Sequence, residues 1–489
     1  MGLGASLDGH VYLTDTLLGN LQIWNTYGDG CGTWLPEGTP TTGIDVSEDG
    51  LIHTTTGTMG GLTESVVVYD GDPLVPVLSW GGHGIAYGDF LTPASVAVDP
   101  VGRSFVVETD GHRVQVFDAA GGTERVFASF GSGDVQVSHP RGIALGPDRT
   151  VYIADTANHR ISKWNVAVAT EETEVAGADR FLTAVEASRM AYPVDGSVDI
   201  VVLATAFNWP DALGGTALAG TVQGPLLLTP PDALPSAVAA EITRLAPKRV
   251  YVLGGTAAVS DDVLEAAKAL TSMDIATRLD GADRYETAIE IAAEVKAMRG
   301  SLYDGTAFVC TGADFPDALS AAPIAAANGW PIYLTPTDAL PGDVADAMIR
   351  NDWGGNPSNH GYIIGGTAVV STGVADTLDA SPFMGFMRIW GPNRYATSAE
   401  VATVGFDGLG MLMSRPALTT GEDFPDALAG GVLQGNDCCP VLLTRGTSLS
   451  PDAGAVLSEH KDMIYEIRYL GGAQVLTGPV RASARALLW

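Results

Sequence analysis

Two short motifs each occur three times in the last two-thirds of this chain, at a nearly constant spacing. The first is an acid or amide followed by arginine and an aromatic residue, with 104 and 110 residues between successive arginines. The second is Pro-Asp-Ala-Leu, with 106 and 109 residues between successive aspartates. A period this long exceeds that of solenoid repeats, so it indicates three tandem copies of one small domain.

The length and charge of the chain narrow the possibilities further. Its 489 residues predict three or four domains, and its formal net charge of −31 makes nucleic acid a poor partner. No apolar run is long enough to span a bilayer. Residues 1–8 lack the basic and apolar regions of a signal peptide, so for a secreted protein we expect the signal to be removed or to lie upstream.

Residues 1–165 contain a looser repeat of short alternating strands. The clearest unit spans residues 140–164, and a similar unit at 93–117 precedes it by 47 residues. Each unit predicts three strands separated by polar turns, and two weaker units lie upstream. The period suggests β-propeller blades, and the pattern resembles NHL repeats. We expect about four antiparallel blades in residues 1–168, as a four-bladed ring or as part of a larger one.

The histidines and cysteines give little indication of a metal site. His112 and His159 occupy matching turns of two predicted blades, and we interpret them as turn residues, with a metal or catalytic role as the alternative. The four cysteines form no Cys-x-x-Cys pair, which argues against zinc. The adjacent Cys438 and Cys439 are either two reduced thiols or a strained vicinal disulfide.

The middle copy of the long repeat predicts alternating strands and helices. Asp283 and Glu286 form a capping box at the start of a helix with an apolar stripe. Three continuously apolar strands follow, each leading into a helix, which is typical of a parallel sheet covered on both faces. The strands are expected at 307–311, 331–335 and 362–366, at 200–205, 225–229 and 250–255 in the first copy, and at 417–420, 440–444 and 469–472 in the third.

The order Gly-x-Asp-Arg-Tyr-x-Thr-Ala, Phe-Pro-Asp-Ala-Leu, Pro-x-x-Leu-Thr and Gly-Gly-Thr-Ala-x-Val-Ser resembles the cell wall binding repeat 2 family over residues 174–489. The resemblance implies three three-layer α/β domains, at 174–271, 278–382 and 388–489, packed as a pseudo-threefold trimer. It also implies noncovalent attachment of secreted surface proteins of Gram-positive bacteria to anionic wall polymers. The third copy departs from the pattern at Asn393, Ala473 and Gln474.

Nine residues form the candidate polymer-binding set, three in each copy. The arginines could contact phosphate, pyruvyl or uronate groups, or could pair with a neighbouring acid such as the Pro-Asp-Ala-Leu aspartate. Three more residues are expected to cap helices at the carboxyl edge of each sheet, where ligands and anions bind. The arginines are Arg180, Arg284 and Arg394, the expected caps are Asn208, Asp314 and Asp423, and the Pro-Asp-Ala-Leu aspartates are Asp211, Asp317 and Asp426.

These observations favour a noncatalytic protein of the cell wall or cell surface, because no catalytic or nucleotide-binding motif is present. Three weak sites would give avidity for an anionic wall polysaccharide, with the propeller displayed for a ligand or another surface protein. No cofactor is expected. The acidic repeats repel an anionic polymer at long range, so arginine clusters, helix N-termini or a bridging divalent cation such as calcium must overcome this repulsion. The alternatives are a self-assembling subunit of a surface layer or extracellular filament, and a propeller enzyme carried on a wall anchor.

Overall fold

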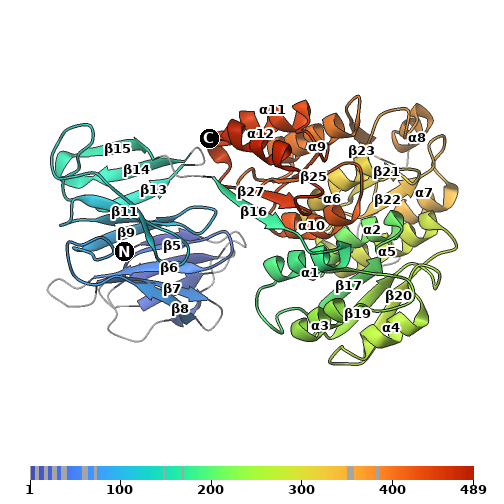
Figure 1. Ribbon diagram of the computed structural model, residues 1–489, viewed down its shortest axis with the longest axis horizontal. Helices are drawn as coiled ribbons and strands as arrows, with labels where there is room; N and C mark the ends of the chain where they lie inside the picture. Colours follow the sequence, from blue (N-terminus) through green and yellow to red (C-terminus); the bar gives the residue numbers. More distant parts are fainter. Residues whose placement is uncertain are drawn as a thin grey trace. The chain divides into compact units, whose positions relative to one another are not determined.

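The protein forms two compact units in the computed structural model, Met1–Ala169 and Thr170–Trp489 (Figure 1). The structure describes residues 2–5, 10–15, 20–24, 30–34, 41–57, 64–70, 74–146, 149–166, 170–349, 357–380, 383 and 385–488. The change from one unit to the next lies within two residues of the boundary expected at 168.

The first unit is built from antiparallel sheets (Figure 1). Three have four strands in sequence order and one has three. The strands are β1 (Leu3–Ala5), β2 (Val11–Asp15), β3 (Asn20–Trp24) and β4 (Gly30–Trp34); β5 (Thr41–Val46), β6 (Ile52–Thr56), β7 (Ser65–Asp70) and β8 (Val75–Trp80); β9 (Pro93–Val98), β10 (Ser104–Glu108), β11 (Arg113–Phe117) and β12 (Thr123–Phe127); and β13 (Gly142–Leu145), β14 (Thr150–Asp155) and β15 (Arg160–Asn165).

The prediction of short antiparallel strands is confirmed, but the sequence missed the fourth strand of a sheet. Strands β8 and β12 expose most of their side chains, so neither carries the apolar alternation that marks a half-buried strand. The inner strands carry that pattern because their side chains fill the cores of the sheets.

A buried acid–arginine pair recurs in the last two sheets. Glu108 lies 2.6 Å from Arg113, and Asp155 lies 2.7 Å from Arg160, with both carboxylates fully buried. Each guanidinium also donates to backbone carbonyls 24, 27 and 28 residues earlier in the chain. The pair therefore ties two strands to the loop that leads into their sheet, which explains why the same residues recur 47 positions apart.

The second unit contains three four-stranded parallel sheets of one plan (Figure 1). In each sheet the first strand of a repeat lies between the second and the third, and a fourth strand pairs with the third. The sheets are β18 (Leu226–Thr229), β17 (Ile200–Thr205), β19 (Arg249–Leu253) and β20 (Ile275–Leu279); β22 (Ile332–Thr335), β21 (Thr306–Thr311), β23 (His360–Ile364) and β24 (Gly385–Ile389); and β26 (Val441–Thr444), β25 (Ala417–Thr420), β27 (Glu466–Leu470) and β16 (Glu171–Val175).

The helices of each repeat follow its strands, as the sequence predicts. The first repeat has α1 (Arg180–Ala191), α2 (Trp209–Thr221), α3 (Ser236–Leu245) and α4 (Asp261–Lys268). The second has α5 (Arg284–Arg299), α6 (Pro316–Asn328), α7 (Gly342–Ile349) and α8 (Thr372–Leu378). The third has α9 (Arg394–Gly408), α10 (Pro425–Asn436), α11 (Pro451–Glu459) and α12 (Gly478–Leu488).

Three helices that begin at the Pro-Asp-Ala-Leu motifs, α2, α6 and α10, pack against one another. Each is buried along nearly its whole length. A Cβ added to Gly220 would lie 2.3 Å from the carbonyl oxygen of Ala326, and one added to Gly435 would lie 2.6 Å from the Cβ of Ala326. Glycine is therefore required where these backbones approach most closely.

Contacts between repeats follow one rule. The first helix of each repeat packs on the central helix of another: α5 on α2, α9 on α6, and α1 on α10. The same helix contact therefore joins all three pairs of repeats: the second to the first, the third to the second, and the first to the third. One hydrophobic core cluster accordingly includes residues of all three repeats.

The fourth strand of each sheet is the element that the sequence missed. Strands β20 and β24 begin in the gaps between the domains expected at 174–271, 278–382 and 388–489. Their side chains are mostly half-buried, so neither strand has the continuous apolar run of a central parallel strand.

Strand β16 completes the sheet of the third repeat although it precedes the first repeat in sequence. It pairs in parallel with β27 over its full length. Glu172 accepts two hydrogen bonds from Arg485, at 2.7 and 2.6 Å, and Glu174 lies 2.5 Å from Arg481, with both arginines on α12. The beginning and the end of the second unit are therefore held together in one sheet.

Within the described part of the chain, no helix combines the length and the apolar character needed to cross a membrane.

We predict that removing β16 destabilises the second unit. A fragment of residues 178–489 should melt at a lower temperature than residues 170–489, because β27 loses its partner and Val175, 1% exposed, leaves the core. Calorimetry would measure both midpoints. As a control, Glu172→Gln with Glu174→Gln in 170–489 should lower the midpoint much less, since the ion pairs are partly exposed. Equal midpoints for the two fragments would show that the pairing of β16 with β27 does not stabilise the second unit.

Candidate functional site

Three junctions of the same construction join the repeats, and the candidate residues gather there. At each junction the first helix of one repeat begins beside the start of the central helix of its neighbour. Asp283 caps α5, since its Oδ1 accepts the amide hydrogens of Tyr285 at 2.8 Å and Glu286 at 3.0 Å. Asp179 and Asn393 cap α1 and α9 in the same way. The amide at position 393 therefore preserves the cap.

The arginine after each cap binds the backbone of its own repeat. Its Nη1 donates to the carbonyl oxygen of the residue directly after the repeat's first strand. The bonds are Arg180 to Ala206 at 2.9 Å, Arg284 to Gly312 at 2.5 Å, and Arg394 to Gly421 at 2.6 Å. Each guanidinium is thus fixed at the carboxyl end of a strand.

Two of the arginines also form ion pairs across the junction. Arg180 Nη2 lies 3.5 Å from Asp423, and Arg394 Nη2 lies 3.5 Å from Asp314. Arg284 faces the first repeat, where the residue equivalent to these aspartates is Asn208. Its guanidinium lies over the ring of Trp209, 5.8 Å from the ring centroid. Pairing with a neighbouring acid was one of two alternatives for these arginines, and the acids involved lie three residues before the Pro-Asp-Ala-Leu aspartates.

The residues expected to cap the central helices do not do so. Asp314 and Asp423 precede α6 and α10 by two residues, and the backbone amide hydrogen that each accepts is that of the next residue, before the helix begins. Asn208 is at the N-cap position of α2, but its side chain makes no capping hydrogen bond. The prediction was wrong because Pro316 and Pro425 start these helices one residue later than expected.

The Pro-Asp-Ala-Leu aspartates pack on the Gly-Gly turns of their own repeats. A Cβ on the first glycine of each turn would lie 2.3 to 2.7 Å from a carboxylate oxygen. These glycines also have φ of 86°, 108° and 95°. The three pairs are Asp211 with Gly254, Asp317 with Gly365, and Asp426 with Gly471. Only glycine satisfies both the left-handed backbone and the close carboxylate.

Burial raises the pKa of all three aspartates. Desolvation is the largest cause for each, and the arginine of the neighbouring repeat opposes it. Hydrogen bonds from Thr397 and Thr183 also lower the pKa of Asp317 and Asp426, respectively. These threonines accept an amide hydrogen at 3.1 Å from the glycine before each cap, so the junction is a continuous polar network.

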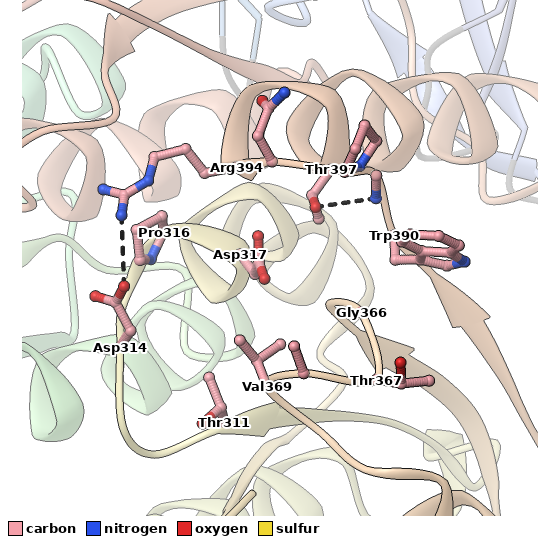
Figure 2. Close-up of a pocket in the computed structure, with 14 residues that line it drawn as sticks. Thr311, Asp314, Pro316, Asp317, Gly366, Thr367, Val369, Trp390, Arg394 and Thr397 are labelled. Atoms are coloured by element: carbon pink, nitrogen blue, oxygen red, sulfur yellow. Dashed lines mark hydrogen bonds and ion pairs between the residues drawn. The ribbon is translucent and has the colours of Figure 1, made fainter.

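A pocket of about 300 Å³ opens at the junction of the second and third repeats (Figure 2). Asp314, Asp317 and Arg394 line it together with Thr367 and Trp390. In Figure 2, Asp317 lies between the Arg394–Asp314 ion pair and Trp390.

Sequence reasoning missed Trp390, which follows β24 directly and is 54% exposed. The aligned positions hold Asp280 before the second repeat and Ala176 before the first. A signal was present, because a tryptophan replaced a polar and a small residue within an otherwise regular motif.

The histidines and cysteines take structural positions. His112 and His159 have φ of 51° and 54°, which confirms them as turn residues. Cys438 and Cys439 are reduced thiols, so the vicinal disulfide is not formed. Over the described ranges, no group of three or more His, Cys, Asp or Glu side chains is arranged to hold a metal ion.

Comparison with known families supports the division into two kinds of repeat. A family model described as cell wall binding domain 2 (CWB2) matches residues 174–264, 278–375 and 388–480, more than half of the chain. An NHL repeat model matches residues 138–164, which include the last sheet of the first unit. Both resemblances predicted from the sequence are confirmed.

Two curated relatives come from Bacillus subtilis (strain 168). The amidase enhancer is 28% identical over 340 residues, which cover 69% of this chain and 43% of the enhancer. N-acetylmuramoyl-L-alanine amidase LytC is 29% identical over 284 residues, 58% of this chain and 52% of LytC. The chain thus spans about half the length of the curated relatives it matches.

Two solved structures from Clostridium difficile share the fold. Cwp8 matches with a TM-score of 0.57 and 24% identity over 69% of this chain and 58% of Cwp8. Cwp6 matches with a TM-score of 0.60 and 18% identity over 100% of this chain and 67% of Cwp6. The parallel-sheet α/β repeats are therefore the fold of those neighbours as well.

We predict that changing Arg180, Arg284 and Arg394 to Gln destabilises the second unit. Each site loses a charge-assisted hydrogen bond to a backbone carbonyl, at a cost of about 1–3 kcal/mol. Urea denaturation would measure the loss, with Lys248→Gln, which breaks an exposed ion pair, as the control. Unchanged stability with weakened wall binding would instead indicate that the arginines contact the polymer.

We also predict a pH-dependent effect of Asp317→Asn. The pKa of Asp317 is raised in the folded protein, so wild type loses stability relative to the variant as pH rises through that pKa. The variant's midpoint minus that of wild type should therefore increase from about pH 4, near the ordinary pKa of aspartate, toward neutral pH. Thermal melts across this range would measure it, with the exposed Asp262→Asn as control. A difference that decreases with pH would refute the prediction.

Proposed function

This chain belongs to the cell wall binding domain 2 family, and we propose that it is a noncatalytic surface protein held on an anionic wall polysaccharide. In this proposal residues 170–489 are the anchor, attached without a covalent bond, and residues 1–169 are displayed for a ligand or partner. The observation that carries it is the match of three consecutive repeats to a wall-binding family. The two curated relatives, an amidase and an amidase enhancer, also favour the cell wall or surface as the location.

The proposal includes a pseudo-threefold arrangement of the repeats. Its support is the contact rule by which each first helix packs on the central helix of another repeat, including α1 on α10. Three similar junctions in one rigid unit would bind a polymer with avidity, because the polymer also repeats along its length. Holding the junctions in place beforehand reduces the entropy cost of binding.

The candidate arginines do not offer free guanidinium groups to an anion. Each already donates to a backbone carbonyl. Two of them also pair with an aspartate. We therefore propose that contacts to polymer hydroxyls carry most of the affinity, and that a divalent cation such as calcium bridges wall anions to the acidic surface.

The first unit is proposed to be an NHL-type β-propeller. Its support is the succession of four antiparallel sheets and the match of the last sheet to the NHL repeat.

We predict that residues 170–489 sediment with purified cell walls and that residues 1–169 do not. The expectation rests on the confinement of the wall-binding repeats to the second unit. Walls stripped of their anionic polymers should lose the binding, and a chelator added to intact walls tests the cation bridge separately. Equal sedimentation of residues 1–169 would refute the assignment of the anchor.

A further inference from the structure

The three junctions are alike in their backbone but not in the side chain that faces the second glycine of each Gly-Gly turn. A Cβ on Gly366 would lie 3.4 Å from the Trp390 ring. The corresponding neighbours are the Asp280 carboxylate, 3.7 Å from a Cβ on Gly255, and the Ala176 Cβ, 3.8 Å from one on Gly472. The same place thus holds an indole, a carboxylate or a methyl group.

Trp390 gives its junction an aromatic wall. The residue before it, Ile389, is 3% exposed and anchors the end of β24, whereas the indole is 54% exposed and lines the pocket. Small-molecule pockets combine such aromatic surfaces with a few polar groups that fix orientation. Here the polar groups include Thr367, which is exposed at the Gly-Gly turn, and Asp314 across the pocket (Figure 2).

The charges in this pocket disfavour an anion. Its ionisable side chains are Asp314, Asp317 and Arg394, and Arg394 is already bonded to Gly421 and paired with Asp314. A phosphate or uronate entering here would meet carboxylates without a free cation. A sugar hydroxyl fits better, since a carboxylate accepts hydrogen bonds and a threonine hydroxyl both donates and accepts them.

We propose that the junction of the second and third repeats is a subsite for an uncharged sugar ring, which stacks on Trp390 and hydrogen-bonds through its hydroxyls to Asp314 and Thr367. The inference rests on the proposed wall-binding function and deepens it. It makes the three junctions unequal, because Asp280 and Ala176 provide no stacking surface at the other two. The charged groups of the polymer would lie outside this pocket.

The test is a ligand-observed NMR titration of the full chain with two neutral sugars, glucose and N-acetylglucosamine, and with anionic glucuronate. We expect the neutral sugars to bind more tightly than glucuronate, and Trp390→Ala to weaken them roughly tenfold. Thr367→Val should also weaken them, because it removes one hydroxyl at nearly constant volume. Failure of both neutral sugars to bind in a Trp390-dependent way, or tighter binding of glucuronate, would overturn the proposal.

Two matched control variants test whether the loss of sugar binding is specific to substitutions in the pocket. Met387→Ala changes an exposed side chain within β24, 69% exposed, and should leave sugar binding unchanged. Thr256→Val makes the threonine change at the equivalent turn of the first repeat and should also have no effect. Equal weakening by these controls would overturn the proposal, and thermal midpoints would verify that every variant is folded.

Cell wall sedimentation of the same variants distinguishes this inference from the proposed function. If the full chain fails to bind walls while neutral sugars still bind through Trp390, the wall anchor is refuted and the sugar subsite stands. If the full chain binds walls and Trp390→Ala changes neither wall nor sugar binding, the anchor stands and the subsite is refuted.

Discussion

The close packing of α2, α6 and α10 is the constraint on which the rest of the second unit depends. These helices approach at Gly220, Gly435 and their alanines, where a larger side chain would force the backbones apart. Their first turns are brought together as well, since the rings of Trp209 and Phe315 lie 6.4 Å apart and those of Phe315 and Phe424 lie 5.7 Å apart. The junctions form beside these first turns, so the helix packing determines where each cap and arginine can act.

The repeated motifs are explained largely by structure. In every copy the arginine binds a backbone carbonyl of its own repeat, and the motif aspartate packs on a glycine turn. Such roles must be filled in each copy for the copies to fold and join, so recurrence alone does not identify a binding residue. Trp390 is informative for the opposite reason. It departs from the other two copies at an exposed position, where folding does not require an aromatic ring.

Much of this fold could be predicted from the sequence, because the central strands are continuously apolar and the helices carry caps and stripes. The edge strands β16, β20 and β24 could not, since the mostly exposed side chains of β16 and the mostly half-buried ones of β20 and β24 leave no continuous apolar run. The partners of Arg180 and Arg394 were also beyond sequence reasoning. They lie 243 and 80 residues away, on another repeat, and depend on how the repeats pack.

An acidic protein and an anionic wall polymer repel each other at long range, and this repulsion weakens where salt screens it. Attraction must then arise at short range, from groups that tolerate a carboxylate nearby. Sugar hydroxyls and the apolar face of a sugar ring meet that condition, whereas a free phosphate does not. Asp314 and Trp390, on opposite sides of one pocket, provide a hydrogen-bond acceptor and a stacking surface. A net charge of −31 is therefore compatible with wall binding, provided that the contacts recognise the uncharged part of the polymer.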